Sequence, residues 1–378
     1  MNTAQPSPFS GLLREGIRSR FVEANGLHMH LLEAGYESPG RPCVLLLHGF
    51  PELALSWRNT MLPLARAGFH VLAPDQRGYG RTSGWENAYD CELRQFGMMN
   101  LVTDAICLVR AAGHKDAYAV IGHDYGSPVA AYAALIRPDI FRRVVLMASP
   151  FGGVPDVPVD GAGESAAPAR DSIHEDLAAL GRVHYKWYLS TREANEHLLH
   201  PRQGLRAFLR AYYHYKSSDW KGNAPFPLNS WTAGELVKIP TYYIMEQGKD
   251  MPANCAPFMP SPEAESANTW LPDAILRACA EEFERTGFQG ALNWYRCDTA
   301  GINAREIKIF TGRTITVPSL FIAGASDWCA YQRPGALDAM AQSACAEHRG
   351  THFIDGAGHW VQQEQPEATN RLLLRFLG

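Results

Sequence analysis

A buried strand that turns sharply into a helix is the feature that most constrains how this chain can fold. Residues 119–122 have the apolar character of a strand covered on both faces. Residues 128–135 continue as a helix, with Pro128 in its first turn, where a missing N–H costs little. Such a turn brings two backbones close together, so small residues must flank it. Three residues meet that demand: Gly122, Gly126 and Ser127.

The turn has Asp124 at its centre, and a carboxylate there has specific chemistry. Strand, tight turn and helix form a nucleophile elbow, which holds a reactive side chain at the tip of a bend. An Asp with the reference pKa of about 3.9 is already ionised at pH 7. It can attack a saturated carbon and form an alkyl ester, which base-activated water then hydrolyses. The alternative interpretation is that Asp124 only caps the helix that follows.

Strands and helices alternate along both ends of the chain, which predicts an α/β fold with a mostly parallel sheet flanked by helices. Residues 21–24 and 27–34 flank Asn25-Gly26, a hairpin signal. Further strands are predicted at 44–47, 70–74, 144–147, 317–324 and 351–354, and further helices at 56–67, 98–109 and 366–376.

The pattern changes from about residue 150. Residues 152–169 are rich in Gly, Pro, Ala and Asp and predict an entry loop, and residues 174–215 are helical in character and aromatic. A Pro-, Asn- and Ser-rich segment follows, whose part from 221 to 266 has no assigned role. We therefore expect a core of residues 1–150 and 306–378, interrupted by a mainly helical lid at 151–305 that covers Asp124.

Composition narrows the possible functions. The chain of 378 residues is 46% hydrophobic and carries a net charge of −4, which is ordinary for a globular enzyme and gives no electrostatic case for nucleic acid or an anionic membrane. The eight cysteines are scattered without a C-x-x-C pair, and the histidines show no metal-binding spacing. With no secretory signal or apolar span, we expect a cytoplasmic protein without a metal.

A nucleophile needs a base, and the base needs an acid to orient it. His359 follows the last predicted strand in a glycine-rich loop, and Asp327 follows the strand before it. Both, like Asp124, should emerge at the carboxyl edge of the sheet. Asp298 and Asp355 are weaker candidates for the acid, and a turn-forming role for Asp327 is an alternative.

Two backbone N–H groups must stabilise the oxyanion of the second step. The residue after the nucleophile supplies one, so Tyr125 is the first candidate. Phe50, in the loop that follows the strand at 44–47, is the second.

Together these residues resemble the epoxide hydrolases of the α/β-hydrolase superfamily. The resemblance rests on the segments His48-Gly49-Phe50-Pro51, Gly78-Tyr79-Gly80-Arg81-Thr82-Ser83, Gly122-His123-Asp124-Tyr125-Gly126-Ser127 and Gly358-His359-Trp360, with Asp327 as the acid. It implies an α/β-hydrolase fold, a small-molecule epoxide substrate and no cofactor.

The family also has two lid tyrosines that donate hydrogen bonds to the epoxide oxygen. By resemblance, Tyr295 in Gly290–Arg296 is the second, and Tyr185 is the better match for the first, with Tyr188 the runner-up. The resemblance further suggests a substrate pocket lined by His48, Pro51, Trp187, Tyr188, Trp294 and Trp360. The aromatic lid favours an apolar or bulky substrate.

Two other functions remain open at this point. A haloalkane or haloacid dehalogenase would use the same nucleophile and base, and Trp187, Trp294 and Trp360 stand near the relevant motifs. Against it, Tyr125 occupies the position where dehalogenases carry a halide-binding Trp or a carboxylate-binding Arg. The third possibility is a ligand-binding α/β-hydrolase that has lost catalysis. The sequence leaves the oligomeric state open.

Overall fold

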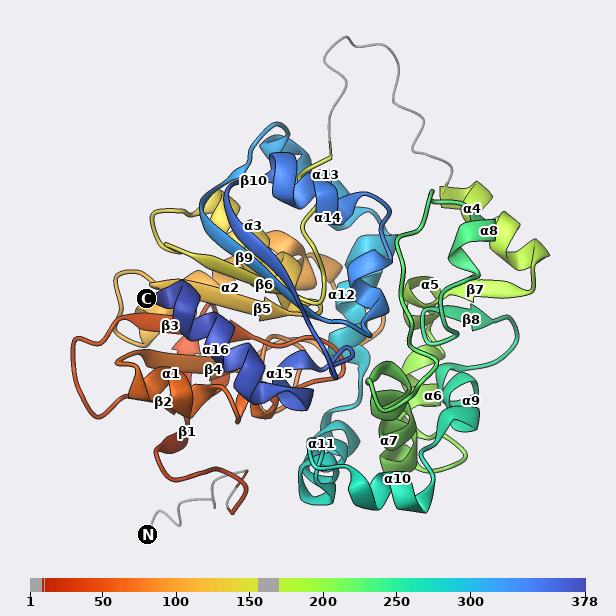
Figure 1. Ribbon diagram of the computed structural model, residues 1–378, viewed down its shortest axis with the longest axis horizontal. Coiled ribbons are helices and arrows are strands. Elements are labelled where there is room, and N and C mark those ends of the chain that lie inside the picture. Colours follow the sequence, from red (N-terminus) through yellow and green to blue (C-terminus); the bar gives the residue numbers. More distant parts are fainter. Residues whose placement is uncertain (1–8, 10, 156–169) are drawn as a thin grey trace.

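An eight-stranded sheet forms the centre of the molecule (Figure 1). The computed structural model describes residues 9, 11–155 and 170–378. Across the sheet the strand order is β1-β2-β4-β3-β5-β6-β9-β10. The strands are β1 (Ile17–Ala24), β2 (Leu27–Ala34), β3 (Cys43–Leu47), β4 (His70–Pro74), β5 (Ala119–His123), β6 (Val144–Met147), β9 (Ile315–Gly324) and β10 (Cys345–Ile354).

The predicted hairpin and the predicted parallel sheet are both present. Strands β1 and β2 pair antiparallel, with Ala24 opposite Leu27. Asn25 and Gly26 between them have φ values of 51° and 73°, the left-handed conformations that a two-residue hairpin turn requires. Strand β2 is antiparallel to β4, and every later pairing in the sheet is parallel. The α/β fold expected from the sequence is therefore confirmed.

Helices flank this sheet. Helices α1 and α16 contact each other, as do α2 and α3. Figure 1 shows α16 crossing the near face of the strands. The helical elements of these two chain segments are η1 (Ala54–Trp57), α1 (Met61–Arg66), η2 (Leu93–Phe96), α2 (Met98–Ala111), α3 (Gly126–Ile136), η5 (Trp328–Tyr331), α14 (Ala336–Ala339), η6 (Met340–Ala344), α15 (Val361–Glu364) and α16 (Pro366–Leu377).

Several boundaries differ from the sequence prediction, and two of the differences are large. The helix predicted at 56–67 is divided into η1 and α1. The last strand begins at Cys345, six residues before the predicted start at 351. It lies at the edge of the sheet and alternates between half-buried and exposed residues, so it lacks the apolar run by which a central strand is recognised.

Most of the described elements between β6 and β9 are helical and lie beside the sheet, on the right in Figure 1, whereas α12 lies between the two parts and α13 lies with the sheet and contacts α2. The elements of this region are α4 (Arg170–Ala179), β7 (Arg182–His184), α5 (Tyr185–Leu189), α6 (Ala194–Leu199), α7 (Leu205–Lys216), α8 (Ala233–Leu236), β8 (Ile244–Glu246), α9 (Met251–Cys255), η3 (Ala256–Phe258), α10 (Pro262–Ala267), α11 (Asp273–Thr286), α12 (Gln289–Thr299), α13 (Ile302–Ile307) and η4 (Lys308–Phe310).

The sequence did not predict β7. Strands β7 and β8 form a small antiparallel pair, and β7 interrupts the helical stretch predicted at 174–215. Each has three residues, too few to show a period. Most of the entry loop predicted at 152–169 lies outside the described residues, and the lid boundary at 151–305 stays a prediction. Across the described ranges, no helix combines the length and the apolar character needed to cross a membrane.

Candidate active site

The turn between β5 and α3 has the close backbone packing of a nucleophile elbow. Asp124 has φ 52°, an unfavourable value for a residue with a side chain. A Cβ atom on Gly122 would lie 2.0 Å from the carbonyl oxygen of Gly126, and one on Gly126 would lie 2.2 Å from that of Leu47. Only glycine fits at either position, so the sequence requirement for small residues follows from the packing.

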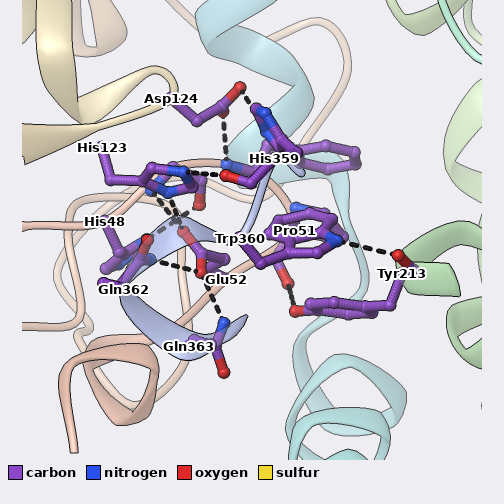
Figure 2. Close-up of polar contacts among 12 residues, drawn as sticks. His48, Pro51, Glu52, His123, Asp124, Tyr213, His359, Trp360, Gln362 and Gln363 are labelled. Carbon is purple, nitrogen blue, oxygen red and sulfur yellow. Dashed lines mark hydrogen bonds and ion pairs between the residues drawn. The ribbon is translucent and has the colours of Figure 1, made fainter. Parts of the chain in front are cut away.

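The carboxylate of Asp124 points toward the predicted base (Figure 2). Its Oδ2 lies 3.2 Å from His359 Nε2, and its Oδ1 accepts a hydrogen bond of 2.9 Å from the backbone N–H of Phe50. Helix α3 has no side-chain cap, so the alternative of Asp124 as a helix cap is wrong. The Phe50 N–H therefore lies at the nucleophile, where an oxyanion donor is needed.

His359 bridges the two carboxylates. Its Nδ1 lies 3.1 and 3.2 Å from the two oxygens of Asp327, and its Nε2 makes no hydrogen bond within the described part of the chain. Both side chains are buried. Of the two weaker candidates for the acid, Asp298 pairs with Lys186 at 3.0 Å, and Asp355 is exposed. The geometry thus brings Asp327 to the base.

Asp124 is held in its ionised form. Burial opposes ionisation, but the nearby His359, Lys216 and His123 outweigh it and hold the pKa of Asp124 well below its usual range. A carboxylate with this pKa is a nucleophile at any pH near neutrality.

His123 and Glu52 form a buried pair next to the nucleophile, and the pair contacts the base. The sequence did not reveal this pair. His123 Nδ1 lies 2.6 Å from Glu52 Oε2, and His123 Nε2 lies 2.7 Å from the carbonyl oxygen of His359 (Figure 2). Although burial lowers the pKa of His123, Glu52 and Asp124 raise it above its ordinary value. The other Glu52 oxygen accepts hydrogen bonds from Gln362 and Gln363.

A second buried carboxylate holds the loop that carries the base. Glu364 accepts hydrogen bonds from the N–H groups of Gly358 and Trp360, on either side of His359, at 2.9 Å each. It also accepts one from Ser218 N–H at 2.8 Å. No motif in the sequence marks Glu364, because its partners are backbone groups.

The predicted tyrosines lie on two elements that meet near the nucleophile. Tyr185 begins α5 and Tyr295 is in α12, and their ring centres are 5.8 Å apart. Burial, with a further contribution from Asp124, raises the pKa of both phenols well above 10, so they stay protonated. The Tyr188 hydroxyl instead lies 3.2 Å from His197 Nδ1. Of the two candidates for the first tyrosine, Tyr185 is the one in contact with Tyr295.

The other residues expected at the pocket have mixed positions. His48 is buried, and its Nε2 accepts a hydrogen bond from Gln76 N–H, so it helps to fix the loop that carries Phe50. Four more make contacts with other parts of the protein. The Pro51 carbonyl accepts a hydrogen bond from the Tyr213 hydroxyl, and Trp187 packs on His184. The indole N–H groups of Trp294 and Trp360 donate to the backbone carbonyls of Arg77 and Tyr213. The Tyr125 hydroxyl donates to the Trp294 carbonyl at 3.1 Å.

One group of side chains has metal-ligand chemistry. The ligand atoms of Asp124, Cys329 and His359 all lie within 4.8 Å of one another, and all three residues are buried. A carboxylate, a thiol and an imidazole form a donor set suited to Zn²⁺. Because two of the three are the nucleophile and the base, a metal here would block the site.

Comparison with known proteins agrees with this geometry. A family described as "alpha/beta hydrolase fold" matches residues 42–366. Epoxide hydrolase B of Mycobacterium tuberculosis is 31% identical over 366 residues, covering 95% of this chain and 98% of the relative. Epoxide hydrolase A of the same organism is 33% identical over 370 residues, covering 95% and 96%.

Solved structures give the same result. An epoxide hydrolase from an endophytic Streptomyces superposes with a TM-score of 0.77 at 31% identity, covering 96% of each chain. Potato epoxide hydrolase I superposes with a TM-score of 0.72 at 29% identity, covering 96% of this chain and 99% of the other. This chain therefore belongs to the epoxide hydrolases of the α/β-hydrolase fold.

Proposed function

We propose that this protein hydrolyses an epoxide to a vicinal diol through an alkyl ester on Asp124. The observation that carries the proposal is the arrangement around one carboxylate. Asp124 is ionised, its Oδ2 lies 3.2 Å from His359 Nε2, and its Oδ1 accepts a hydrogen bond from Phe50. A carboxylate that is already charged, beside an imidazole, is better suited than a neutral hydroxyl to attack a saturated carbon.

In the first step, Asp124 attacks an oxirane carbon and the C–O bond breaks. Charge develops on the oxirane oxygen, and Tyr185 and Tyr295 donate hydrogen bonds to it. Their raised pKa values mean that both phenols carry their protons at pH 7. One phenol transfers its proton to the oxygen, leaving a hydroxyalkyl ester of Asp124.

In the second step, His359 Nε2 takes a proton from water, and the resulting hydroxide attacks the ester carbonyl. Asp327 holds His359 through Nδ1 and stabilises the imidazolium. The N–H groups of Phe50 and Tyr125 stabilise the oxyanion. Collapse of the tetrahedral intermediate breaks the ester C–O bond, and the departing diol oxygen takes the proton from His359. The proton of the new Asp124 carboxyl group returns to the tyrosinate, which restores the carboxylate and the phenol as the diol leaves.

The alternative dehalogenase has less support. Two of its three candidate halide donors, Trp294 and Trp360, already donate their indole N–H groups to backbone carbonyls at 2.9 Å. The many aromatic side chains in the lid support an apolar or bulky substrate.

Mass spectrometry of the intact protein tests the mechanism. His359→Gln, incubated with an epoxide that the wild type converts, should gain the mass of that epoxide on Asp124, because ester formation no longer leads to hydrolysis. Asp124→Asn is the matched control and should neither turn over nor gain mass. A His359→Gln protein that is folded and inactive but never gains mass would contradict the covalent mechanism.

A further inference from the structure

A lysine with an unusual environment lies beside the proposed catalytic residues, and apart from its charge, which helps to keep Asp124 ionised, it has no part in the mechanism above. Lys216 is the last residue of α7, and only 2% of it is exposed. Its backbone carbonyl accepts a hydrogen bond of 2.9 Å from the N–H of His359, so the residue directly contacts the base loop. A Cβ atom on Gly358 would lie 2.6 Å from the same carbonyl, which shows how closely the two segments pack.

Aromatic rings surround the ammonium group of Lys216. The distances from Nζ to the ring centres are 4.7 Å for Tyr243, 5.2 Å for Tyr212, 5.2 Å for Trp360 and 5.9 Å for Tyr242. Such contacts favour the charged form of a lysine. They do not replace hydrogen bonds, because an ammonium has three N–H donors.

These donors have no acceptor in the described part of the chain. Among the residues that the structure describes, Lys216 Nζ makes no hydrogen bond and no carboxylate lies within ion-pair distance of it. Every other cation of comparable burial has an acceptor: Arg58 donates to Gln363, Arg77 pairs with Asp104, and Arg210 donates to Leu271. A buried charge without a partner is costly, so the position of Lys216 calls for a ligand.

The ammonium is close to the reacting groups. Burial lowers the pKa of Lys216 below its ordinary value, and of the charges that oppose this effect and favour the protonated lysine, that of Asp124 is the strongest. The four rings around Nζ form an aromatic cage that adjoins the catalytic side chains. The Trp360 ring lies 4.6 Å from the His359 ring, and the Tyr243 ring lies 5.0 Å from the Tyr185 ring. The Tyr243 ring thus lies between Lys216 and Tyr185, one of the two tyrosines that we expect to hold the epoxide oxygen.

We propose that Lys216 and its aromatic cage bind a carboxylate carried by the epoxide, so that the enzyme selects epoxy acids. The proposal rests on the function proposed above, because it places the oxirane between Asp124 and the two tyrosines. A carboxylate near the oxirane accepts hydrogen bonds from Nζ, and the rings hold the adjoining carbon chain. Without Lys216, the Asp124 charge would repel such a substrate.

A pair of substrates that differ only in charge tests this subsite. The probes are 3-phenyloxirane-2-carboxylate and its primary amide, which have nearly the same shape. The wild type should show a kcat/KM for the acid about 10- to 100-fold above that for the amide, the factor expected for hydrogen bonds from a buried cation to an anion. A ratio near one or below would overturn the proposal.

Variants of Lys216 locate the preference. Lys216→Met keeps the length of the side chain without the charge, and it should reduce the acid-to-amide ratio to one or below, because the Asp124 charge then repels the acid without compensation. Lys216→Arg should retain part of the preference. Each ratio is taken within one variant, so a change in folded fraction cancels. The matched control is Lys238→Met, which removes an exposed lysine already paired with Glu235 at 2.5 Å and should leave the ratio at the wild-type value.

A measurement on the wild type alone covers the case in which Lys216→Met does not fold. Cinnamate should inhibit hydrolysis of a neutral epoxide more strongly than cinnamamide, again by about 10- to 100-fold. Equal inhibition would count against the subsite. Failure here is distinguishable from failure of the mechanism: a covalent adduct on His359→Gln together with no acid preference removes the subsite and leaves the ester mechanism intact.

Discussion

His123 Nε2 lies 2.7 Å from the carbonyl oxygen of His359, so the residue before the nucleophile directly holds the backbone of the base. The other ring nitrogen of His123 faces Glu52 at 2.6 Å. Because both nitrogens face acceptors, the ring satisfies both only as an imidazolium, in agreement with its raised pKa. The nucleophile and the base are thus fixed relative to each other by a buried ion pair.

Glu52→Gln should therefore slow ester hydrolysis more than ester formation. Without the carboxylate, the pKa of His123 falls and the neutral ring loses one of its two N–H donors. A displaced His359 should lower the hydrolysis rate by about 10- to 100-fold. Rapid-quench kinetics under single-turnover conditions separate the two steps.

The matched control is Asp75→Asn. His30 and Asp75 form another fully buried pair, at 2.7 Å, and make no contact with His359. This variant should lose stability without changing the ratio of the two rates. Equal effects of both variants on that ratio would show that the His123–Glu52 pair has only a structural role.

Glu364→Gln should loosen the loop of the base and change how stability depends on pH. Burial raises the pKa of Glu364 to about 7 from its ordinary value of 4.5, although backbone N–H groups lower it. The folded protein therefore binds a proton that the unfolded chain has released, and this carboxyl group lowers stability as pH rises from 4.5 to about 7. Glutamine does not titrate and turns an N–H toward the donors, so unfolding should become easier by about 1–3 kcal/mol and lose this pH dependence.

Urea unfolding at pH 5 and pH 8 measures both effects. The unfolding free energy that is lost between pH 5 and pH 8 should be smaller in Glu364→Gln than in the wild type. The other titrating groups are common to both proteins, so their contribution cancels when the two losses are compared. An unchanged loss would mean that Glu364 is ionised across the whole range.

Glu33 should act in the opposite direction. Burial opposes its ionisation, but hydrogen bonds with His70, Arg20 and Arg18 hold its pKa far below 4.5. The stability it contributes is present above pH 4.5 and is lost as pH falls toward the folded-state value. Glu33→Gln should cost about 1–3 kcal/mol at pH 7 and less at pH 3, as measured by urea unfolding. A cost that does not depend on pH would contradict the assignment.

The sequence could predict those parts of the fold and site that depend on local pattern. The elbow around Asp124 was predictable because glycines at 122 and 126 are required wherever a strand and a helix backbone touch. The Asn25-Gly26 hairpin was predictable because both residues tolerate positive φ. Asp327 and His359 could be found because each follows a strand of a parallel sheet, and such sheets place their sites at that edge.

The rest depends on contacts between distant segments. Glu364 acts only on backbone N–H groups, so no residue pattern reveals it. Lys216 is unremarkable in a sequence of 35 lysines and arginines, and its importance follows from rings contributed by α7, the chain before β8 and the base loop. The sequence favoured Tyr185 over Tyr188 only by resemblance, and the structure distinguishes them by their contacts: Tyr185 contacts Tyr295, whereas Tyr188 contacts His197.

Zn²⁺ or Cd²⁺ should inhibit the enzyme reversibly by binding Asp124, Cys329 and His359. The two anionic ligands balance the charge of the ion once Cys329 loses its proton, and burial, together with the charge of Asp327, raises the pKa of that thiol, so inhibition should strengthen with pH. A Cd–thiolate charge-transfer band in the ultraviolet reports binding without reference to activity.

Cys329→Ser should weaken binding of Cd²⁺ and remove the band, with inhibition expressed relative to the metal-free rate of the same variant. Cys255→Ser is the matched control, because Cys255 is also buried and has Met251 as its contact. Retention of the band in Cys329→Ser would place the metal elsewhere.

Tyr185→Phe and Tyr295→Phe should each slow ester formation and leave ester hydrolysis nearly unchanged. Both phenols stay protonated at pH 7 and lie near Asp124, so each can stabilise the oxygen that leaves the attacked carbon. When one is removed the other still donates, so we expect a loss of about 10- to 100-fold for each single variant and about 10,000-fold for the double variant. Stopped-flow tryptophan fluorescence during a single turnover follows the first step directly.

Tyr188→Phe is the control that decides between the two candidates for the first tyrosine. It removes a hydroxyl of the same helix, α5, whose neighbour is His197 rather than the nucleophile. The rate of ester formation should stay within a few-fold of the wild type. If Tyr188→Phe instead slows this step as much as Tyr295→Phe does, while Tyr185→Phe has little effect, the epoxide oxygen lies against Tyr188. The substrate would then approach Asp124 from the side of α6 (Ala194–Leu199), away from Tyr243 and Lys216.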